Sequence, residues 1–340
     1  MNSESFYFNF ESKFRGDRKK ILERLSIYDG LISFLKDKFK DPRVLDIGSG
    51  RGEWIEKCSD KNISSVGIEL NQIMSKYCTD RGMDVLQGDA LEIMKGFKKG
   101  SFSMISLFHI IEHIDHLKLV QILEECIRVL SIDGIILVET PSIDNLQVSS
   151  KLFYIDHTHI NPINPDGFLF LLKQIGFNFS DYYYINGAPL QNTRHDAVTR
   201  IFNGIAQDVA FLGFVKEETM QTYLLKKDYQ IKKKDLSIST LKAASDFDTA
   251  YMKRNQFYED QINILNTSIS SYKEEIKKLS TRLDVLDNEY DYTIDQYQYV
   301  FKKIMFNFIK KIIIKLGIDP LALKNLCKRI FTILDRKSVV

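Results

Sequence analysis

Apolar and polar positions follow two alternating patterns from the start of the chain to about residue 210. Short apolar runs that predict strands fall at residues 44–47, 65–69, 84–87, 104–108, 135–140, 179–184 and 197–202. Stretches with apolar residues at helical spacing lie between them, most clearly at residues 17–38, 118–130 and 168–175. Strands that alternate with helices predict an α/β fold in which helices cover a largely parallel sheet.

The pattern changes at Tyr258, from which apolar residues recur at alternating intervals of three and four. A heptad held over more than four repeats predicts a left-handed coiled coil. After a one-residue skip the seam continues at Ile294, Tyr297 and Phe301. A single long helix packed on the globular domain is the alternative. The main seam consists of apolar residues throughout: Tyr258, Ile262, Leu265, Ile269, Tyr272, Ile276, Leu279, Leu283, Leu286 and Tyr290.

Residues 301–316 combine apolar positions at helical spacing with lysines at 302, 303, 310, 311 and 315. A second basic segment extends from Leu321 to about Leu334. Basic amphipathic helices of this kind bind anionic membrane surfaces. Helices that pack on each other or on a partner protein would show the same pattern, so both interpretations stay open.

These patterns divide the chain into a globular domain (1–210), a helical linker (211–257), a coiled coil (258–301) and basic amphipathic C-terminal helices (302–340). The net charge of +2 argues against a nucleic-acid partner. Neither a signal peptide nor a transmembrane run is evident, so we expect a cytoplasmic protein. The cysteines show no CxxC pair and indicate neither zinc nor disulfides: Cys58, Cys78, Cys126 and Cys327.

The first predicted strand runs into a glycine-rich turn, GSGRG, at residues 48–52. Ligands of open α/β folds bind at this carboxyl edge of the sheet, where glycines let the backbone approach them at positive φ. Such a turn alone also fits dinucleotide-binding folds. Asp46 favours a different ligand, because a carboxylate there would repel a pyrophosphate but attract the ammonium and sulfonium of S-adenosylmethionine.

Further candidate contacts follow at successive strand ends. Glu69 ends the second strand, where an acid can accept hydrogen bonds from both ribose hydroxyls. Asp89 and Ala90 follow the third strand and suit the edge of an adenine. Phe108 ends the fourth strand, and His109 follows it directly. Both would form the floor of the cofactor pocket and face the acceptor.

Because all four strand ends carry such contacts, residues 40–185 resemble the class I S-adenosylmethionine-dependent methyltransferases. The resemblance implies a Rossmann-like methyltransferase domain over residues 1–210, with S-adenosyl-L-methionine as the cofactor. The residues then expected to bind the cofactor are Arg15, Asp46, Gly48, Ser49, Gly50, Gly52, Trp54, Glu69, Leu70, Asp89, Ala90, Phe108 and His109.

Five stretches resemble, more narrowly, the bacterial O-antigen chain-terminating methyltransferases: residues 6–16, 50–54, 108–113, 139–141 and 153–159. In that family the methyltransferase domain precedes a long coiled coil, and some members carry a kinase between the two. No kinase-like segment fits here after about residue 210. The resemblance implies methylation of the terminal sugar, on a hydroxyl or a phosphate, of a lipid-linked bacterial surface polysaccharide. Chain growth would thereby end.

The implied partners are a lipid-linked glycan acceptor, one or two further copies of the chain through the coiled coil, and an anionic membrane surface. A glycan polymerase or glycosyltransferase is a further expected partner. The implied location is peripheral, at the inner face of the cytoplasmic membrane. One alternative is a small-molecule or lipid methyltransferase of the same fold. Another is a scaffold that recruits a glycan polymerase to the membrane.

Methyl transfer to a hydroxyl requires an aligned acceptor and the removal of its proton. His159 is the expected base, Asp156 would orient it or the acceptor, and His113 is the second choice for the base. Structural roles are the alternative, since His113 could simply close a helix N-terminus and Asp156 could cap the loop. The spacing of these residues fits no standard helical pair of metal ligands, so no metal is expected.

Overall fold

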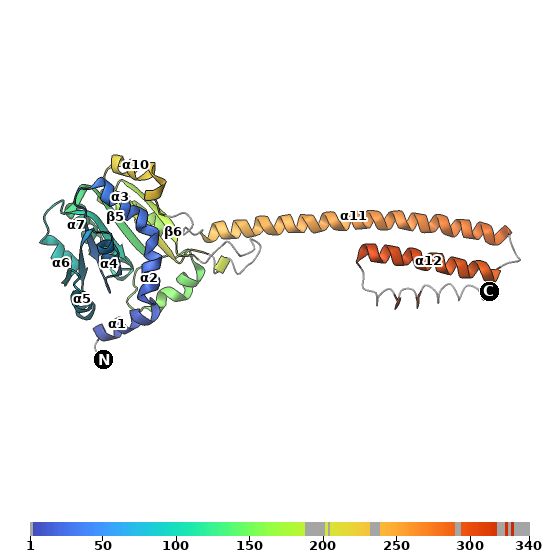
Figure 1. Ribbon diagram of the computed structural model, residues 1–340, viewed down its shortest axis with the longest axis horizontal. Helices are drawn as coiled ribbons and strands as arrows, with labels where there is room; N and C mark the ends of the chain where they lie inside the picture. Colours follow the sequence, from blue (N-terminus) through green and yellow to red (C-terminus); the bar gives the residue numbers. More distant parts are fainter. Residues whose placement is uncertain are drawn as a thin grey trace. The chain divides into compact units, whose positions relative to one another are not determined.

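The structure is a computed structural model, and it describes residues 3–187, 201–202, 205–231, 239–289, 294–317, 324–325 and 328–329. The chain forms two compact units, Met1–Arg254 and Asn255–Val340. The first unit is an α/β domain, and the described part of the second is helical (Figure 1).

A seven-stranded sheet forms the centre of the first unit, with the strand order β3-β2-β1-β4-β5-β7-β6. Strands β1 to β5 run parallel to one another, whereas β7 is antiparallel to both β5 and β6. This sheet confirms the predicted Rossmann-like fold. The strands are Arg43–Ile47 (β1), Ser64–Glu69 (β2), Val85–Gln87 (β3), Phe102–Phe108 (β4), Leu130–Pro141 (β5), Phe179–Ile185 (β6) and Asp208–Phe214 (β7).

Helices surround this sheet and connect its strands. Their bounds in the first unit are Ser3–Phe14 (α1), Arg18–Arg24 (α2), Leu25–Tyr28 (η1), Asp29–Lys38 (α3), Glu53–Asp60 (α4), Gln72–Thr79 (α5), Ala90–Lys95 (α6), Ile111–His113 (η2), His116–Val129 (α7), Val148–Leu152 (η3), Phe153–Ile155 (η4), Pro165–Ile175 (α8), Glu217–Leu225 (α10) and Lys227–Tyr229 (η6).

Both faces of the sheet are buried. Val44 and Leu45 are neighbours in β1 but belong to different hydrophobic clusters, because successive side chains of a strand point to opposite faces. The cluster that contains Val44 packs α2, α3 and Trp54 of α4 against the sheet, and the cluster that contains Leu45 packs α7 and α8. Burial on both faces explains why the strands form nearly continuous apolar runs in the sequence.

The strand that follows β6 in the chain is not the one that the sequence predicts. The sequence predicts a strand at residues 197–202, but residues 201–202 are helical and residues 197–200 lie outside the described part of the chain. The strand that pairs with β6 is instead β7, and all of its residues are buried.

The core also continues past residue 210, into the segment that the sequence predicts as a helical linker. Tyr223 of α10 is only 1% exposed, and its ring meets that of Phe34 edge to face, with the centroids 5.6 Å apart. Tyr229 packs on the other side of Phe34, at 5.2 Å. The sequence of this segment is polar because two exposed lysines, Lys226 and Lys227, lie between these two tyrosines.

The second unit holds most of a long helix, Thr240–Glu289 (α11, 50 residues), and a shorter one, Ile294–Leu316 (α12). Tyr272 of α11 meets Phe308 of α12 with ring centroids 6.2 Å apart, and α12 lies alongside α11 (Figure 1). Most of the predicted helix from Leu321 to Leu334 falls outside the described residues. Within the described part of the chain, no helix is long and apolar enough to cross a bilayer.

The seam predicted for the coiled coil stays accessible along α11. Seven of its side chains are partly exposed and form an apolar stripe that another helix could cover, whereas Tyr272 contacts Phe308 of α12. The side chains of Leu286 and Tyr290 lie outside the described part of the chain. The exposed fractions include Tyr258 56%, Ile262 55%, Leu265 43%, Ile269 41%, Ile276 43%, Leu279 40% and Leu283 37%.

We predict that the core contribution of β7 can be measured by truncating one side chain. Leu212 is 1% exposed, so Leu212→Ala should lower the free energy of unfolding by about 2–5 kcal/mol. Leu225 is 81% exposed, and Leu225→Ala should change it by no more than about 0.5 kcal/mol. Denaturant unfolding of both variants measures the difference, and equal stabilities would contradict the placement of β7.

Candidate active site

The glycine-rich turn after β1 forms one wall of the site. Gly48, Gly50 and Gly52 have φ of 69°, 54° and 75°, a region that favours glycine. A Cβ on Gly48 would lie 2.8 Å from Ile110 Cδ1, so the turn also packs too tightly for any side chain at this position. Gly48 N and Ser49 N both donate to Ile68 O of β2, which fixes the turn against the neighbouring strand.

A cavity of about 370 Å³ opens beside this turn at the carboxyl edge of the sheet. It lies where ligands of open α/β folds are expected. Most residues predicted from the sequence line it: Arg15, Asp46, Gly48, Ser49, Trp54, Phe108, His109, His113, Asp156 and His159.

The remaining predicted residues do not line this cavity. Gly50 and Glu69 contact each other, because Gly50 N donates to Glu69 Oε2 at 2.8 Å, while Asn71 N donates to Glu69 Oε1 at 2.8 Å. Each oxygen keeps a second lone pair, with which it can accept a bond from a ribose hydroxyl. Glu69 therefore holds the glycine-rich turn, a role that the sequence does not reveal. The others outside the cavity are Gly52, Leu70, Asp89 and Ala90.

Asp89 also has a structural role that competes with the predicted one. Its Oδ1 accepts from Leu91 N and Glu92 N at the start of α6, and its Oδ2 forms an ion pair with Lys118 Nζ at 2.6 Å. Leu70, by contrast, is 66% exposed and open to a ligand.

Asp46 is the buried acid of the cavity. Its Oδ1 accepts a hydrogen bond from Ser106 Oγ of β4 at 2.7 Å. Burial raises the pKa of Asp46 to about 7, since a low-dielectric surrounding disfavours the charged carboxylate. A cationic ligand in the cavity would restore the charged form, as an ammonium or sulfonium would.

Four buried polar atoms of the cavity wall have no hydrogen-bond partner among the described residues, and two of them belong to neutral side chains. Neither Ser49 Oγ nor Trp54 Nε1 has a hydrogen-bond partner among the described residues. Buried polar atoms in folded proteins are nearly always satisfied, so both are expected to meet a ligand. Together with Asp46, they suit a ligand such as S-adenosylmethionine, which carries both a cationic amino-acid end and hydrogen-bonding atoms.

Helix α1 supplies a wall of the cavity that the sequence analysis largely missed. Beside the predicted Arg15, this segment contributes Tyr7, Phe10, Glu11 and Phe14. Arg15 Nη1 forms an ion pair with Glu11 Oε1 at 3.2 Å. The recurrence of aromatic residues at helical spacing was the available signal.

His109 lies at the centre of a buried ionic cluster that the sequence does not predict. Its Nε2 lies 3.3 Å from Glu139 Oε1 and 3.8 Å from Asp208 Oδ1. Burial alone would lower the pKa of His109, but the surrounding carboxylates, Asp208 foremost, raise it to about 10. His109 is therefore an imidazolium at neutral pH. Two further residues complete the cluster. Tyr28 Oη donates to Glu139 Oε2 at 2.6 Å, and Arg24 Nη2 donates to Asp208 Oδ2 at 2.6 Å.

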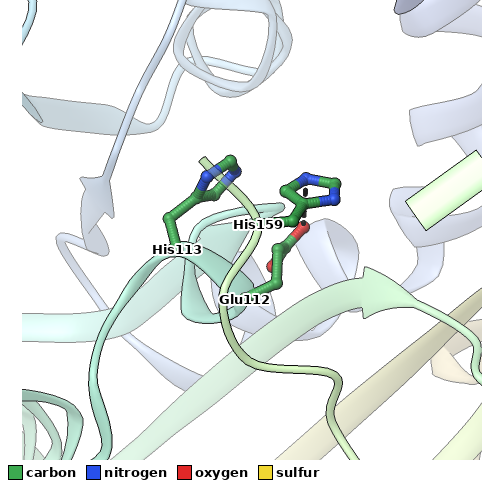
Figure 2. Close-up of side chains that lie close together, drawn as sticks. All are labelled: Glu112, His113 and His159. Carbon is green, nitrogen blue, oxygen red and sulfur yellow. Dashed lines mark ion pairs between the residues drawn. The ribbon is translucent and has the colours of Figure 1, made fainter. Parts of the chain in front are cut away.

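Two of the predicted catalytic residues, His113 of η2 and His159 of the loop before α8, lie close together (Figure 2), and Asp156 lines the same cavity. His159 Nδ1 lies 2.7 Å from Phe153 O, and a carbonyl only accepts, so Nδ1 carries the proton and Nε2 keeps a lone pair. Asp156 Oδ2 lies 3.9 Å from that Nε2. The rings of His113 and His159 meet edge to face with centroids 4.6 Å apart. The structure thus brings all three predicted residues together.

Comparison with known proteins identifies the domain. A family model described as a methyltransferase domain matches residues 17–180. The crystal structure of an S-adenosylmethionine-dependent methyltransferase from Archaeoglobus fulgidus is 30% identical, with a TM-score of 0.52; the match covers 61% of this chain and 99% of that one. No curated protein matches the sequence.

Other solved methyltransferase structures are more distantly similar. A methyltransferase from Methanosarcina mazei is 16% identical, with a TM-score of 0.42, over 53% of this chain and 95% of that one. Phosphoethanolamine N-methyltransferase 2 from Haemonchus contortus, solved with S-adenosyl-L-methionine, is 14% identical, with a TM-score of 0.41, over 63% and 60% of the two chains.

The chain belongs to the class I S-adenosylmethionine-dependent methyltransferases, and S-adenosylmethionine is its cofactor. This agrees with the broader of the two resemblances that the sequence carries.

We predict that cofactor binding depends on pH through Asp46. Its pKa of about 7 means that the carboxyl is neutral below this pH and charged above it. Affinity for the cationic cofactor should therefore fall by about tenfold per pH unit below 7 and level off above it. Calorimetry with S-adenosylmethionine at pH 6 and pH 8 measures the change.

Asp46→Asn should weaken binding at pH 8 by about 10- to 100-fold and remove the pH dependence. Asp60, an exposed acid at the end of α4, provides the control, because Asp60→Asn should leave both unchanged. Full affinity in Asp46→Asn would contradict the assignment of Asp46 to the cofactor.

Proposed function

We propose that this methyltransferase transfers the methyl group to an oxygen of the terminal sugar, or of a phosphate on it, of a lipid-linked bacterial surface polysaccharide. The observation that supports an oxygen acceptor is the lone pair on Nε2 of His159. This residue lines the same cavity as Asp46. S-adenosylmethionine supplies a methyl group already bonded to a good leaving group. The protein then has to align the acceptor and remove its proton.

His159 takes this proton in the proposed reaction. Its neighbour His113 is neutral, since burial lowers the pKa of His113. Asp156 lies close enough to Nε2 to stabilise the imidazolium that forms, at 3.9 Å from its Oδ2. Aromatic side chains on two sides of the cavity, Tyr7 of α1 and Phe153 of η4, suit the apolar face of a sugar ring.

The rest of the chain supports a glycan acceptor at a membrane surface. The apolar stripe of α11 favours assembly into a dimer or trimer, which would set a distance between the methyltransferase domain and the C-terminal segment. Lysines of α12 favour contact with anionic lipid. A small-molecule or lipid acceptor is the alternative for the same domain, and neither would require the long helix.

The enzyme reaction can be tested with labelled S-adenosylmethionine and purified lipid-linked glycans of defined end groups. We expect label in the terminal sugar, and His159→Ala should lower the turnover by about 100- to 10,000-fold. Cofactor affinity should stay unchanged, because the predicted cofactor contacts are intact. His116→Ala, at an exposed histidine that begins α7, is the matched control.

Methyl transfer to a small hydroxyl compound, with no transfer to any of the glycans, would overturn the proposed acceptor. A chain that binds neither cofactor nor glycan would instead favour the scaffold role.

We also predict that the C-terminal segment holds the protein on anionic vesicles. Removal of residues 301–340 should abolish co-sedimentation with vesicles that contain phosphatidylserine. A full-length variant with the five lysines of residues 302–315 changed to glutamate should behave in the same way, because the attraction is electrostatic. Unchanged sedimentation of both would exclude this membrane contact.

A further inference from the structure

Three side chains beside the acceptor region converge. Glu112 and His113 come from η2, and His159 comes from the loop before α8 (Figure 2). One potential ligand atom from each lies within 4.8 Å of the others. Glu112 Oε1 and His159 Nε2 are 4.0 Å apart.

The carboxylate of Glu112 is fully buried and only partly satisfied. Oε2 accepts a hydrogen bond from Thr140 Oγ1 at 2.9 Å, whereas Oε1 has no hydrogen-bond partner among the described residues. The nearest charge is the imidazolium of His109, with Nδ1 at 3.4 Å from Oε1. Oε1 thus has an ion-pair partner and keeps a lone pair, with which it can bind a further group.

Both histidines are held in the form that binds a metal. Thr158 has one hydroxyl proton, which it donates to Asp156 Oδ1 at 2.6 Å. Its oxygen can therefore only accept from His113 Nδ1, at 2.8 Å, so His113 Nε2 keeps a lone pair. His159 Nε2 is free for the same reason, since its Nδ1 donates to Phe153 O. Such second bonds orient the histidine ligands of metal sites.

The backbone fixes this arrangement. Ile160 N and Asn161 N both donate to Glu112 O at 3.0 Å, which ties the loop that carries His159 to η2. The neighbouring group of His109, Glu139 and Asp208 differs, because Arg24 Nη2 and Tyr28 Oη already bond its two carboxylates, at 2.6 Å each.

We propose that Glu112, His113 and His159 bind a divalent transition-metal ion, such as Zn²⁺, at the acceptor side of the cavity. Two imidazole nitrogens and one carboxylate suit such an ion, whereas Mg²⁺ prefers an octahedron of oxygens. Three protein ligands leave a fourth position open, as in catalytic zinc sites. In a tetrahedral site, metal–ligand bonds of about 2.0–2.2 Å place the ligand atoms about 3.3–3.6 Å apart, so binding draws the three side chains together.

This inference rests on the proposed function in one respect, namely that the acceptor is an oxygen. That oxygen would take the open position, where the ion lowers the pKa of its hydroxyl. With the ion bound, the lone pair of His159 would be donated to the metal, and Asp156 would replace His159 as the base. The hydroxyl proton would pass to the carboxylate of Asp156, and the oxygen would keep the electron pair. The sequence analysis expected no metal because it weighed Asp156 and the histidines, and did not include Glu112.

The test is metal binding by the untagged full-length protein. After treatment with a chelator, the chain should bind one Co²⁺ and develop visible absorption. Zn²⁺ should displace the ion, whereas millimolar Mg²⁺ should not. His159→Ala should weaken Co²⁺ binding by more than about 100-fold, and His116→Ala, the exposed control, should leave it unchanged.

Thr158→Val provides a second variant, because the replacement of the buried Glu112 risks unfolding. It removes the acceptor of the His113 Nδ1 proton and should weaken Co²⁺ binding by about 10- to 100-fold. Equal Co²⁺ binding in all variants would overturn the metal site. So would the absence of binding at about 1 mM Co²⁺.

The outcome is separable from that of the proposed function. Full methyl transfer to the glycan by metal-free protein would overturn the metal site and leave the proposed acceptor in place. Stoichiometric Co²⁺ binding lost in His159→Ala, without any transfer to glycans, would support the ion and overturn the acceptor.

Discussion

The adjacency of β1 and β4 is the constraint on which the site depends. The chain leaves β1 for β2 and β3 on one side, then crosses to place β4 on the other side of β1. The turn after β1 and the segment after β4 therefore open at the same edge, and Ser106 of β4 can hydrogen-bond Asp46 of β1. Without this crossover the glycine-rich turn and the histidine-containing segment would not share one cavity.

A second feature of the site is the amount of charge that it buries. Asp46, Glu112, Glu139 and Asp208 are all at most 5% exposed. Burial dominates at Asp46 and raises its pKa, whereas at Glu112 the neighbouring His109 outweighs burial and lowers the pKa. Because buried charges need partners, a cavity with this surplus of carboxylates favours cationic ligands. The sulfonium cofactor and the proposed metal ion both meet this condition.

In the proposed function, the two units divide the work between chemistry and location. The first unit contains the whole lined cavity, from Tyr7 to Asp208. In the second unit, the partly exposed seam of α11 and the lysines of α12 supply features for assembly and for lipid contact.

The sequence alone determined the local features, because these depend on residues close together in the chain. Apolar periodicity located β1 to β6 and α11, and the turn at 48–52 with Asp46 indicated the cofactor class. Only the tertiary structure decided which distant residues meet. It showed that Asp208–Phe214 completes the sheet, that Glu69 holds Gly50, and that Glu112 faces His159 across 47 residues of sequence. Pairings of this kind arise from packing and buried charge, which have no period or spacing in the sequence.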